Sequence, residues 1–265
     1  IGPQATASAV VVEQGSPYVT PAHFEPALPA ITARAGDAIA VSHAPGSLGL
    51  RHLPPPDPEH FSTPAGEPGF LAQYYSSANL AFPGSARADA VVADPSLGAA
   101  PDIRGLPGRN QWSVRYDSVF TPDASGMHRF TLHGSGSARL TIDGQVVGEF
   151  EHADFGHAIF ANVELPAGEP VDVRIEFTPR AALRSERMEM FGMEMGLTMR
   201  FGHAGPDTLI ADAARAAREA DVAVVFVGEL VGEGMDRTSL SLQADQDRMI
   251  AAVAAANPNT VVVLN

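Results

Sequence analysis

The sequence lacks cysteine altogether and is poor in basic residues. With no cysteine among its 265 residues, the chain has neither disulfides nor thiolate metal sites. Lys and Arg together number 17 against 31 Asp and Glu, so the formal net charge is −14. A surface that binds nucleic acid or an anionic membrane needs clustered basic side chains. The composition therefore argues against both partners and favours a neutral one.

Long apolar runs and a signal-like start are also missing. No run approaches the ~20 apolar residues that a membrane-spanning helix requires. The chain begins at Ile1, with no initiator Met, basic segment or apolar stretch. Its last residues, Val261 to Leu264, are typical of a buried central strand. We therefore expect a segment of a longer protein, with any targeting signal outside it, and localisation is not predicted.

What is present is a globular composition with many turns. Apolar residues make up 45% and charged residues 18%, with 25 Gly and 22 Pro, which excludes a disordered low-complexity chain. The length suits two domains, because one hydrophobic core usually serves ~100–200 residues.

The first part of the chain, residues 1–53, has an α/β pattern. A short helix is predicted from Pro26 to Ala35, ended by Gly36, and a strand from Ala38 to Ser42. Residues 54–69 are rich in proline, which fixes φ and removes backbone donors. We expect that segment to be a linker.

Residues 70–201 change to short alternating segments separated by Gly, Pro and Asp. Several short strands at this spacing indicate an all-β sandwich. Asp143-Gly144 suits a two-residue hairpin turn. The clearest predicted strands are Ser113–Phe120, His128–His133, Ala138–Ile142 and Val171–Phe177.

Residues 202–265 return to the α/β pattern. Asp207 is a predicted N-cap for a helix with apolar residues at helical spacing, and a buried strand follows from Val222 to Val227. A loop precedes a second helix, Asp245 to Ala256, and Asn257-Pro258-Asn259 turns the chain into the final strand. The predicted fold is part of a parallel-sheet α/β sandwich interrupted by an inserted all-β sandwich.

The loop after the Val222–Val227 strand carries the strongest candidate for chemistry. Glu233 is flanked by Gly232 and Gly234, which let the backbone turn sharply and leave the carboxylate without bulky neighbours. Open parallel sheets place ligand-binding residues at the carboxyl ends of their strands. On spacing alone, a solvated acidic surface loop is the more frequent explanation.

A family resemblance favours a catalytic role for Glu233 over a solvated surface loop. Several blocks of sequence resemble the C-terminal α/β domain of glycoside hydrolase family 3 and occur in the order found in that family. At the start these are Ile1-Gly2-Pro3, Gly15-Ser16, Val19-Thr20-Pro21 and Ala44-Pro45-Gly46. Towards the end they are Val227-Gly228-Glu229, Glu233-Gly234-Met235-Asp236-Arg237, Leu240-Ser241-Leu242, Gln246 and the run from Asn257 to Leu264.

The middle part resembles a protective-antigen-like β-sandwich, which some members of this family carry as an insertion. The residues that carry this resemblance are Phe70–Tyr75, Ser113–Tyr116, Ser125–Phe130 and Leu140–Gly144. Calcium-dependent lectins of this fold use paired aspartates where this chain has Gly134-Ser135-Gly136-Ser137. We therefore expect no metal site, and the family implies no cofactor.

The resemblance implies a retaining glycosidase that works by double displacement. The nucleophile would be an Asp in a preceding (β/α)8 barrel of the same protein, and Glu233 would be the general acid/base. Glu229 is the rival acid, although its place directly after the strand favours a structural role. Asp236 and Arg237 are expected to form an ion pair that supports the loop.

The inserted sandwich would lie on the leaving-group side, with aromatic side chains stacking on the ligand. Phe155 and Phe160, in an expected loop from Glu151 to Ala161, are the candidates. Trp112 precedes a strand and is expected in the core. The nine His residues have no ligand spacing and receive no role.

Three functional hypotheses follow. The leading one is an exo-acting β-glucosidase, with a β-xylosidase or a hydrolase of natural-product (macrolide) glucosides as alternatives within the family. The second is a non-catalytic carbohydrate-binding module, whose binding would not depend on Glu233. The third is self-association as a homodimer through the insertion, which a large apolar surface patch would support.

Overall fold

The computed structural model describes residues 1–6, 23–48, 53–77, 79–80, 88–97, 112–179, 199–229 and 240–264, without the side chains of residues 152–156. The chain divides into two compact units. The α/β unit contains Ile1–Arg51 and most of the chain after residue 206, and the β unit contains His52–Pro206. Each unit is described by itself below.

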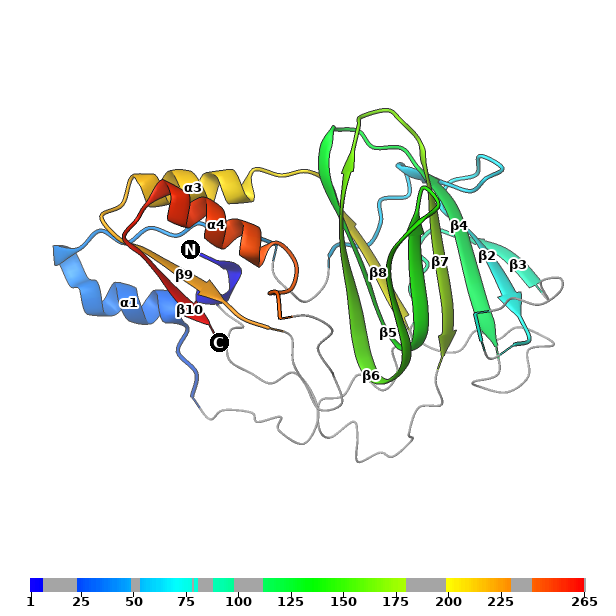
Figure 1. Ribbon diagram of the computed structural model, residues 1–265, viewed down its shortest axis with the longest axis horizontal. Helices are drawn as coiled ribbons and strands as arrows, with labels where there is room; N and C mark the ends of the chain where they lie inside the picture. Colours follow the sequence, from blue (N-terminus) through cyan, green and yellow to red (C-terminus); the bar gives the residue numbers. More distant parts are fainter. Residues whose placement is uncertain are drawn as a thin grey trace. The chain divides into compact units, whose positions relative to one another are not determined.

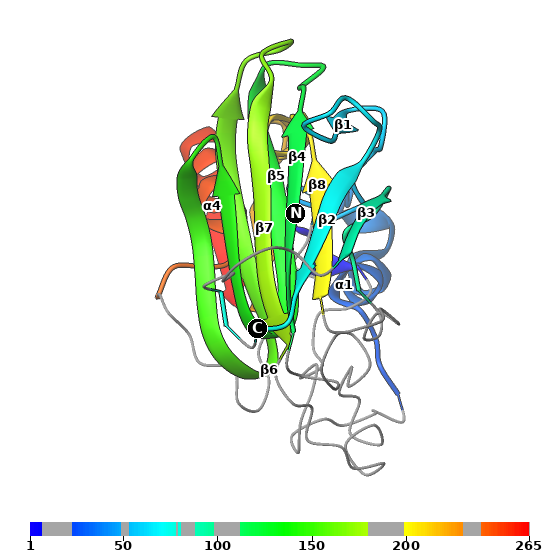
Figure 2. The ribbon, with the colours of Figure 1, turned by 90° about the vertical axis from the view of Figure 1, so that its right-hand side faces the viewer.

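The β unit is one antiparallel sheet that folds over its own core (Figures 1 and 2). Its order is β3-β2-β4-β7-β5-β6, with β1 paired to β4 and β8 paired to β5. The strands are β1 Phe61–Ser62, β2 Phe70–Tyr75, β3 Ala88–Val92, β4 Ser113–Phe120, β5 Gly126–Ile142, β6 Gln145–Leu165, β7 Val171–Pro179 and β8 Met199–Ala204.

The long β5–β6 hairpin connects two layers of this unit. The first half of β5, Arg129–Gly134, pairs with β8, and the second half, Gly136–Ile142, pairs with β7. β6 follows β5 along both halves, with a register shift between Gly134 and Gly136. Such irregularities bend a strand pair and increase its twist. The Gly-Ser stretch considered for calcium therefore lies where the hairpin bends.

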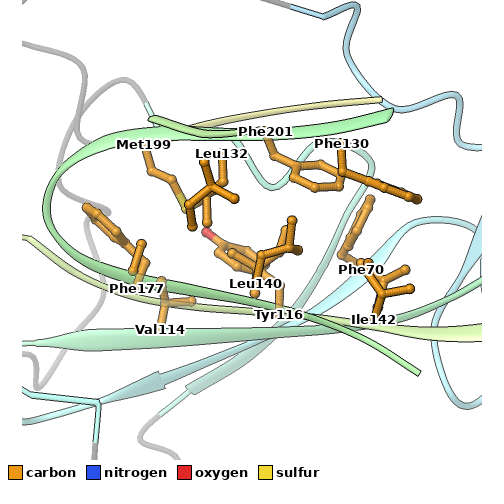
Figure 3. Packing of buried hydrophobic residues seen from close by; sticks show 14 of the residues in the cluster. Phe70, Val114, Tyr116, Phe130, Leu132, Leu140, Ile142, Phe177, Met199 and Phe201 are labelled. Carbon is orange, nitrogen blue, oxygen red and sulfur yellow. The ribbon is translucent and has the colours of Figure 1, made fainter. Parts of the chain in front are cut away.

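A core of apolar side chains fills the space between the two layers. In Figure 3, Met199, Leu132, Phe201 and Phe130 point from one layer toward residues of the other. Burying a large apolar side chain contributes roughly 1.5–3 kcal/mol. Trp112 is 1% exposed, so its expected place in the core is confirmed. The facing residues include Phe70, Val114, Tyr116, Leu140 and Phe177.

The predicted turn at Asp143-Gly144 is confirmed. Ile142 pairs with Gln145, which leaves a two-residue loop. Both loop residues have positive φ, 46° for Asp143 and 74° for Gly144, as a type I′ hairpin requires.

The α/β unit contains a two-stranded parallel sheet of β9, Ala223–Val227, and β10, Thr260–Leu264. Helices α3, Leu209–Arg218, and α4, Gln246–Ala256, pack side by side (Figure 1). Their apolar residues form one core with Val225 and Val227 of β9. None of the helices within the described ranges is long and apolar enough to cross a bilayer.

The opposite face of β9 lies toward α1, Ala27–Ala35. Side chains alternate between the two faces of a strand, so Val224 and Phe226 line the α1 side. Short 3-10 helices at Pro3–Ala5 and Gly36–Ala38 complete the unit. The predicted helix and its Gly36 end are confirmed to within one residue, and Gly36 has a φ of 55°.

Other expectations for local structure were wrong. Residues 38–42 form no strand, because a 3-10 turn occupies Gly36–Ala38 and Ile39 is 64% exposed, beyond the reach of a sheet core. The residue at the N-cap of α3 is Thr208, and Asp207 acts one position earlier by accepting the Leu209 N–H at 2.9 Å.

The proline-rich segment 54–69 is part of the β unit rather than a free linker. It contributes strand β1, and Phe61 is 1% exposed within the core. Its prolines lie before or after Phe61 and Ser62, the two residues that pair with β4. The pairing of β1 with β4 therefore loses no backbone N–H donor to proline.

The described residues are mostly strand with a few helices, and the largest sheet is antiparallel. Within them, strand-to-strand parallel pairing is confined to β9 and β10. The larger parallel-sheet α/β sandwich is therefore still a prediction.

Candidate functional site

The candidate loop begins at the carboxyl end of β9. Val225 and Val227 are fully buried, and Gly228 and Glu229 continue the chain out of the sheet. Residues 230–239 lie outside the described ranges, so the positions of Glu233, Asp236 and Arg237 are untested. The structure does describe both sides of the loop base, up to Glu229 and from Leu240 onward.

One buried side chain holds both sides of this base. Gln246, at the start of α4, accepts the Gly228 N–H at its Oε1 (2.9 Å) and donates from Nε2 to the Gly228 carbonyl (2.7 Å). Nε2 also donates to the carbonyl of Gln243 (3.1 Å). Gln246 is 1% exposed, so these bonds form away from water. Gly228 precedes the loop and Gln243 follows it.

The chain after the loop is anchored to the first turn of α4. Asp247 Oδ2 accepts the Leu242 N–H at 3.2 Å. The Asp245 carboxylate is 2% exposed and pairs with Arg248 at 3.0 Å. Between these anchors Ala244 has a φ of 58°, a strained conformation for a residue with a side chain.

The Asn257-Pro258-Asn259 turn lies at the other end of β9 and is structural. Asn257 Nδ2 donates to the carbonyls of Ala217 and Ala220 at the end of α3, both at 2.8 Å. Asn259 Nδ2 donates to the Asp221 carbonyl just before β9. These bonds join the end of α3 and the turn before β10 to the amino end of β9, opposite the candidate loop.

A cavity of about 220 Å³ lies between α1 and β9. Its walls include Leu28, Ile31, Val224 and Phe226, and among its described lining residues only Ser42 has a polar side chain. A sugar site needs several convergent hydrogen-bonding groups to orient hydroxyls. This cavity is therefore a poor candidate for the sugar.

Comparison with known proteins identifies the family. The model described as "Glycosyl hydrolase family 3 C-terminal domain" matches residues 1–265. The chain belongs to the glycosyl hydrolase family 3 C-terminal domain family.

Curated relatives are similar over most of this chain. A protein named Probable beta-glucosidase I from Aspergillus clavatus is 32% identical over 242 residues, which is 84% of this chain and 28% of that protein. Beta-glucosidase B from Emericella nidulans is 29% identical over 250 residues, which is 88% of this chain and 28% of that protein. The chain thus spans about 28% of the length of each of these relatives.

A solved structure has a similar fold. DesR, a β-glucosidase from Streptomyces venezuelae in complex with D-glucose, aligns with a TM-score of 0.50 and 24% identity. The alignment covers 100% of this chain and 27% of that protein.

In this family 3 chain the aromatic candidates of the insertion lie on a strand, so the expected loop from Glu151 to Ala161 was wrong. On β6 the residue that pairs with Gly134 is His157 and the one that pairs with Gly136 is Ala153, so β6 holds extra residues at the bend while pairing continues on both sides. The backbone of Phe155 lies in this irregular part, and its side chain is outside the described set. Phe160 is partly buried and pairs with Thr131.

Of the two candidate acids in the family 3 loop, the structure describes Glu229 only. It is partly exposed and directly follows Gly228. In the described portions of the chain, no three His, Asp or Glu side chains gather in an arrangement that could hold a metal ion. The role of Gln246 was missed, because its two partners are 18 and 3 residues away and the sequence alone does not show that they meet.

Proposed function

We propose that this chain is the C-terminal part of a retaining β-glucosidase that removes terminal β-D-glucosyl residues, with Glu233 as general acid/base. The observation that carries the proposal is the place of the loop, which leaves the carboxyl end of the buried parallel strand β9. That edge of an α/β sheet is where ligands bind. Family membership and the β-glucosidase names of the relatives support the same activity.

The proposed reaction has two displacements. An Asp in a preceding (β/α)8 barrel attacks the anomeric carbon, the bond to the leaving oxygen breaks, and the Glu233 carboxyl gives that oxygen its proton. The Glu233 carboxylate then takes a proton from water, the water oxygen attacks the anomeric carbon, and the Asp carboxylate leaves. Net retention requires the two carboxyl groups to be ~5–5.5 Å apart.

Other residues have supporting roles in this proposal. Asp236 and Arg237 form an ion pair that holds the loop, and Phe155 and Phe160 contact the leaving group. β9 and β10 belong to a larger parallel-sheet α/β sandwich that presents the loop to the barrel. The barrel selects the sugar, so a panel of glucosides, xylosides and natural-product glucosides would distinguish the alternatives within the family.

The test uses the full-length protein and its Glu233→Gly variant on aryl β-glucosides. The value of kcat/KM should fall steeply for poor leaving groups, which need protonation, and little for the dinitrophenyl glucoside. The kcat on the dinitrophenyl glucoside should fall, because water then attacks the glycosyl-enzyme without its base. Added azide should restore that kcat and yield a β-glucosyl azide, because azide attacks the glycosyl-enzyme without a general base. Glu229→Gln is the matched control and should keep the wild-type dependence on the leaving group.

Unchanged kinetics in Glu233→Gly would contradict the acid/base role of Glu233. That result would favour the hypothesis of a non-catalytic carbohydrate-binding module. A steep dependence on the leaving group in Glu229→Gln instead would transfer the acid/base role to Glu229.

A further inference from the structure

We propose that Gln246 is a positioning residue for the reaction. Its side-chain amide fixes the base of the loop that carries Glu233, and so sets where the acid/base carboxyl group lies. The inference rests on the proposed function, because Gln246 acts through Glu233 and is not proposed to touch the substrate.

The three hydrogen bonds of Gln246 join the two ends of the loop. Gly228, at the entrance, has both its N–H and its carbonyl bound by the amide, at 2.9 and 2.7 Å. Gln243, at the exit, has its carbonyl bound by the same Nε2 at 3.1 Å. A single buried side chain thus bonds both Gly228 and Gln243.

The sheet leaves Gly228 in need of such a partner. On the side of β9 away from β10, the Ile1 nitrogen donates to the Val224 carbonyl at 2.8 Å and the Phe226 N–H donates to the Ile1 carbonyl at 2.9 Å. Peptide groups point to alternate sides along a strand, so Gly228 points to the same side as Phe226. There the neighbouring segment turns into the 3-10 helix Pro3–Ala5, where the Ala5 N–H donates to the Gly2 carbonyl at 3.2 Å, so the segment no longer runs as a strand beside Gly228.

The Gln246 amide therefore takes the place of the missing strand partner. A buried peptide group without a partner is strongly disfavoured, so the strand end would shift to find one. An amide can accept from the N–H and donate to the carbonyl of one residue at the same time. An ionised carboxylate can only accept, and would repel the Gly228 carbonyl.

Glu233 is five residues beyond Gly228 (233 − 228 = 5). A shift of the strand end would move the carboxyl group relative to the glycosidic oxygen. A misplacement of ~1 Å can lower a rate about 100-fold. The loss would concern proton transfer, since the sugar is bound mainly by the barrel in the proposed enzyme.

The experiment compares Gln246→Met with wild type in the full-length protein. Methionine keeps the length of the side chain and removes both hydrogen-bonding functions. For alkyl or other poor leaving groups kcat/KM should fall by about 100-fold, while for dinitrophenyl β-glucoside it should change by less than about threefold, because that leaving group needs no acid. KM should change little.

Asn257→Leu is the matched control. Asn257 is also a buried amide that bonds two backbone carbonyls, but at the opposite end of β9. It should lower thermal stability as Gln246→Met does, and leave the ratio of rates between poor and good leaving groups as in wild type. An equal loss on all substrates in Gln246→Met would overturn the inference, since a purely structural role predicts that pattern.

Gln246→Glu provides a second test if the methionine variant folds poorly. A protonated carboxyl group has one donor and one acceptor and can replace the amide, whereas the ionised group cannot. Activity on poor leaving groups, relative to wild type, should therefore recover as the pH falls. A constant ratio across the pH range would contradict the role of the amide.

The two proposals fail in different ways. If Glu233→Gly leaves the kinetics unchanged, the proposed function falls. If Glu233→Gly gives azide rescue but Gln246→Met shows no dependence on the leaving group, only the role of Gln246 falls.

Discussion

His128 Nδ1 lies 3.1 Å from His203 Nε2, and the two imidazole rings stack at an interplanar angle of 12°. His128 Nε2 is 2.9 Å from the Ala124 carbonyl and must donate to it, because a carbonyl only accepts. In the neutral pair Nδ1 of His128 then accepts the Nε2 proton of His203. Phe120 packs against both rings, in an end of the β unit where a charge is poorly solvated.

The pKa of His203 is lowered from 6.5 to about 4, first by burial and then by the neighbouring His128 and His60, which repel a second positive charge. Because the unfolded chain binds this proton below pH 6.5 and the folded chain does not, the β unit should lose stability as the pH falls from 6.5 to 4. The full contribution is present above pH 6.5, and the loss at pH 4 is about 3 kcal/mol.

Hydrogen exchange in strands β5 and β8 of the full-length protein, measured from pH 7 to pH 4 and corrected for intrinsic rates, checks this loss. His203→Gln keeps a donor for His128 without a titrating group, so its loss of protection should be clearly smaller. His23→Gln removes an exposed histidine and should behave as wild type. Equal acid sensitivity in all three proteins would rule out the pair as the cause.

Phe61 is predicted to be a major contributor to the stability of the β unit, although it lies in a proline-rich segment. Its ring stacks between Phe70 and Phe120, at centroid distances of 5.0 and 4.7 Å. Phe61→Ala should lower the free energy of unfolding of this unit by about 3–5 kcal/mol, from lost burial and the cavity left behind. The midpoint of urea unfolding, followed by fluorescence of the single Trp112, measures the effect.

Val146→Ala is the control in the same unit, because Val146 is 55% exposed and should tolerate truncation. If Phe61→Ala lowers the free energy of unfolding no more than Val146→Ala does, the predicted contribution of Phe61 to the stability of the β unit is contradicted.

Local patterns in the sequence were enough to predict several elements. Strand β4 matches its predicted bounds, Ser113–Phe120, because apolar and polar residues alternate along it and Trp112 precedes it. The Asp143-Gly144 turn was predictable because two consecutive positive φ angles favour these residue types.

Pairing between distant segments was not predictable in the same way. His152 to His157 contain polar and glycine residues typical of a loop, yet β6 continues through them because β5 supplies partners on both sides of the bend. Phe61 gives no local sign of its burial, since its neighbours in the core come from β2, β4 and β8. Such contacts depend on the register of remote strands.

For the candidate site, the structure tests only the base of the loop, and Glu233 stays a prediction. The apolar strand followed by a Gly-rich acidic loop indicated where to look, and the family motifs singled out Glu233 within it. The support beneath the loop depends on Gln246 meeting Gly228, 18 residues away. A lone Gln in the first turn of a helix is usually exposed, so its burial could not be foreseen.

A double-mutant cycle between Glu233 and Gln246 gives the sharpest prediction. If Gln246 acts only by placing the Glu233 carboxyl group, its loss matters only while that group is present. Gln246→Met should therefore lower kcat/KM on poor leaving groups about 100-fold in wild type, and by less than about threefold in the Glu233→Gly background. Strong non-additivity of this kind is expected for residues that act as a unit. Asn257→Leu should have the same small effect in both backgrounds, and a full Gln246→Met effect without Glu233 would show that Gln246 acts on something other than the acid/base.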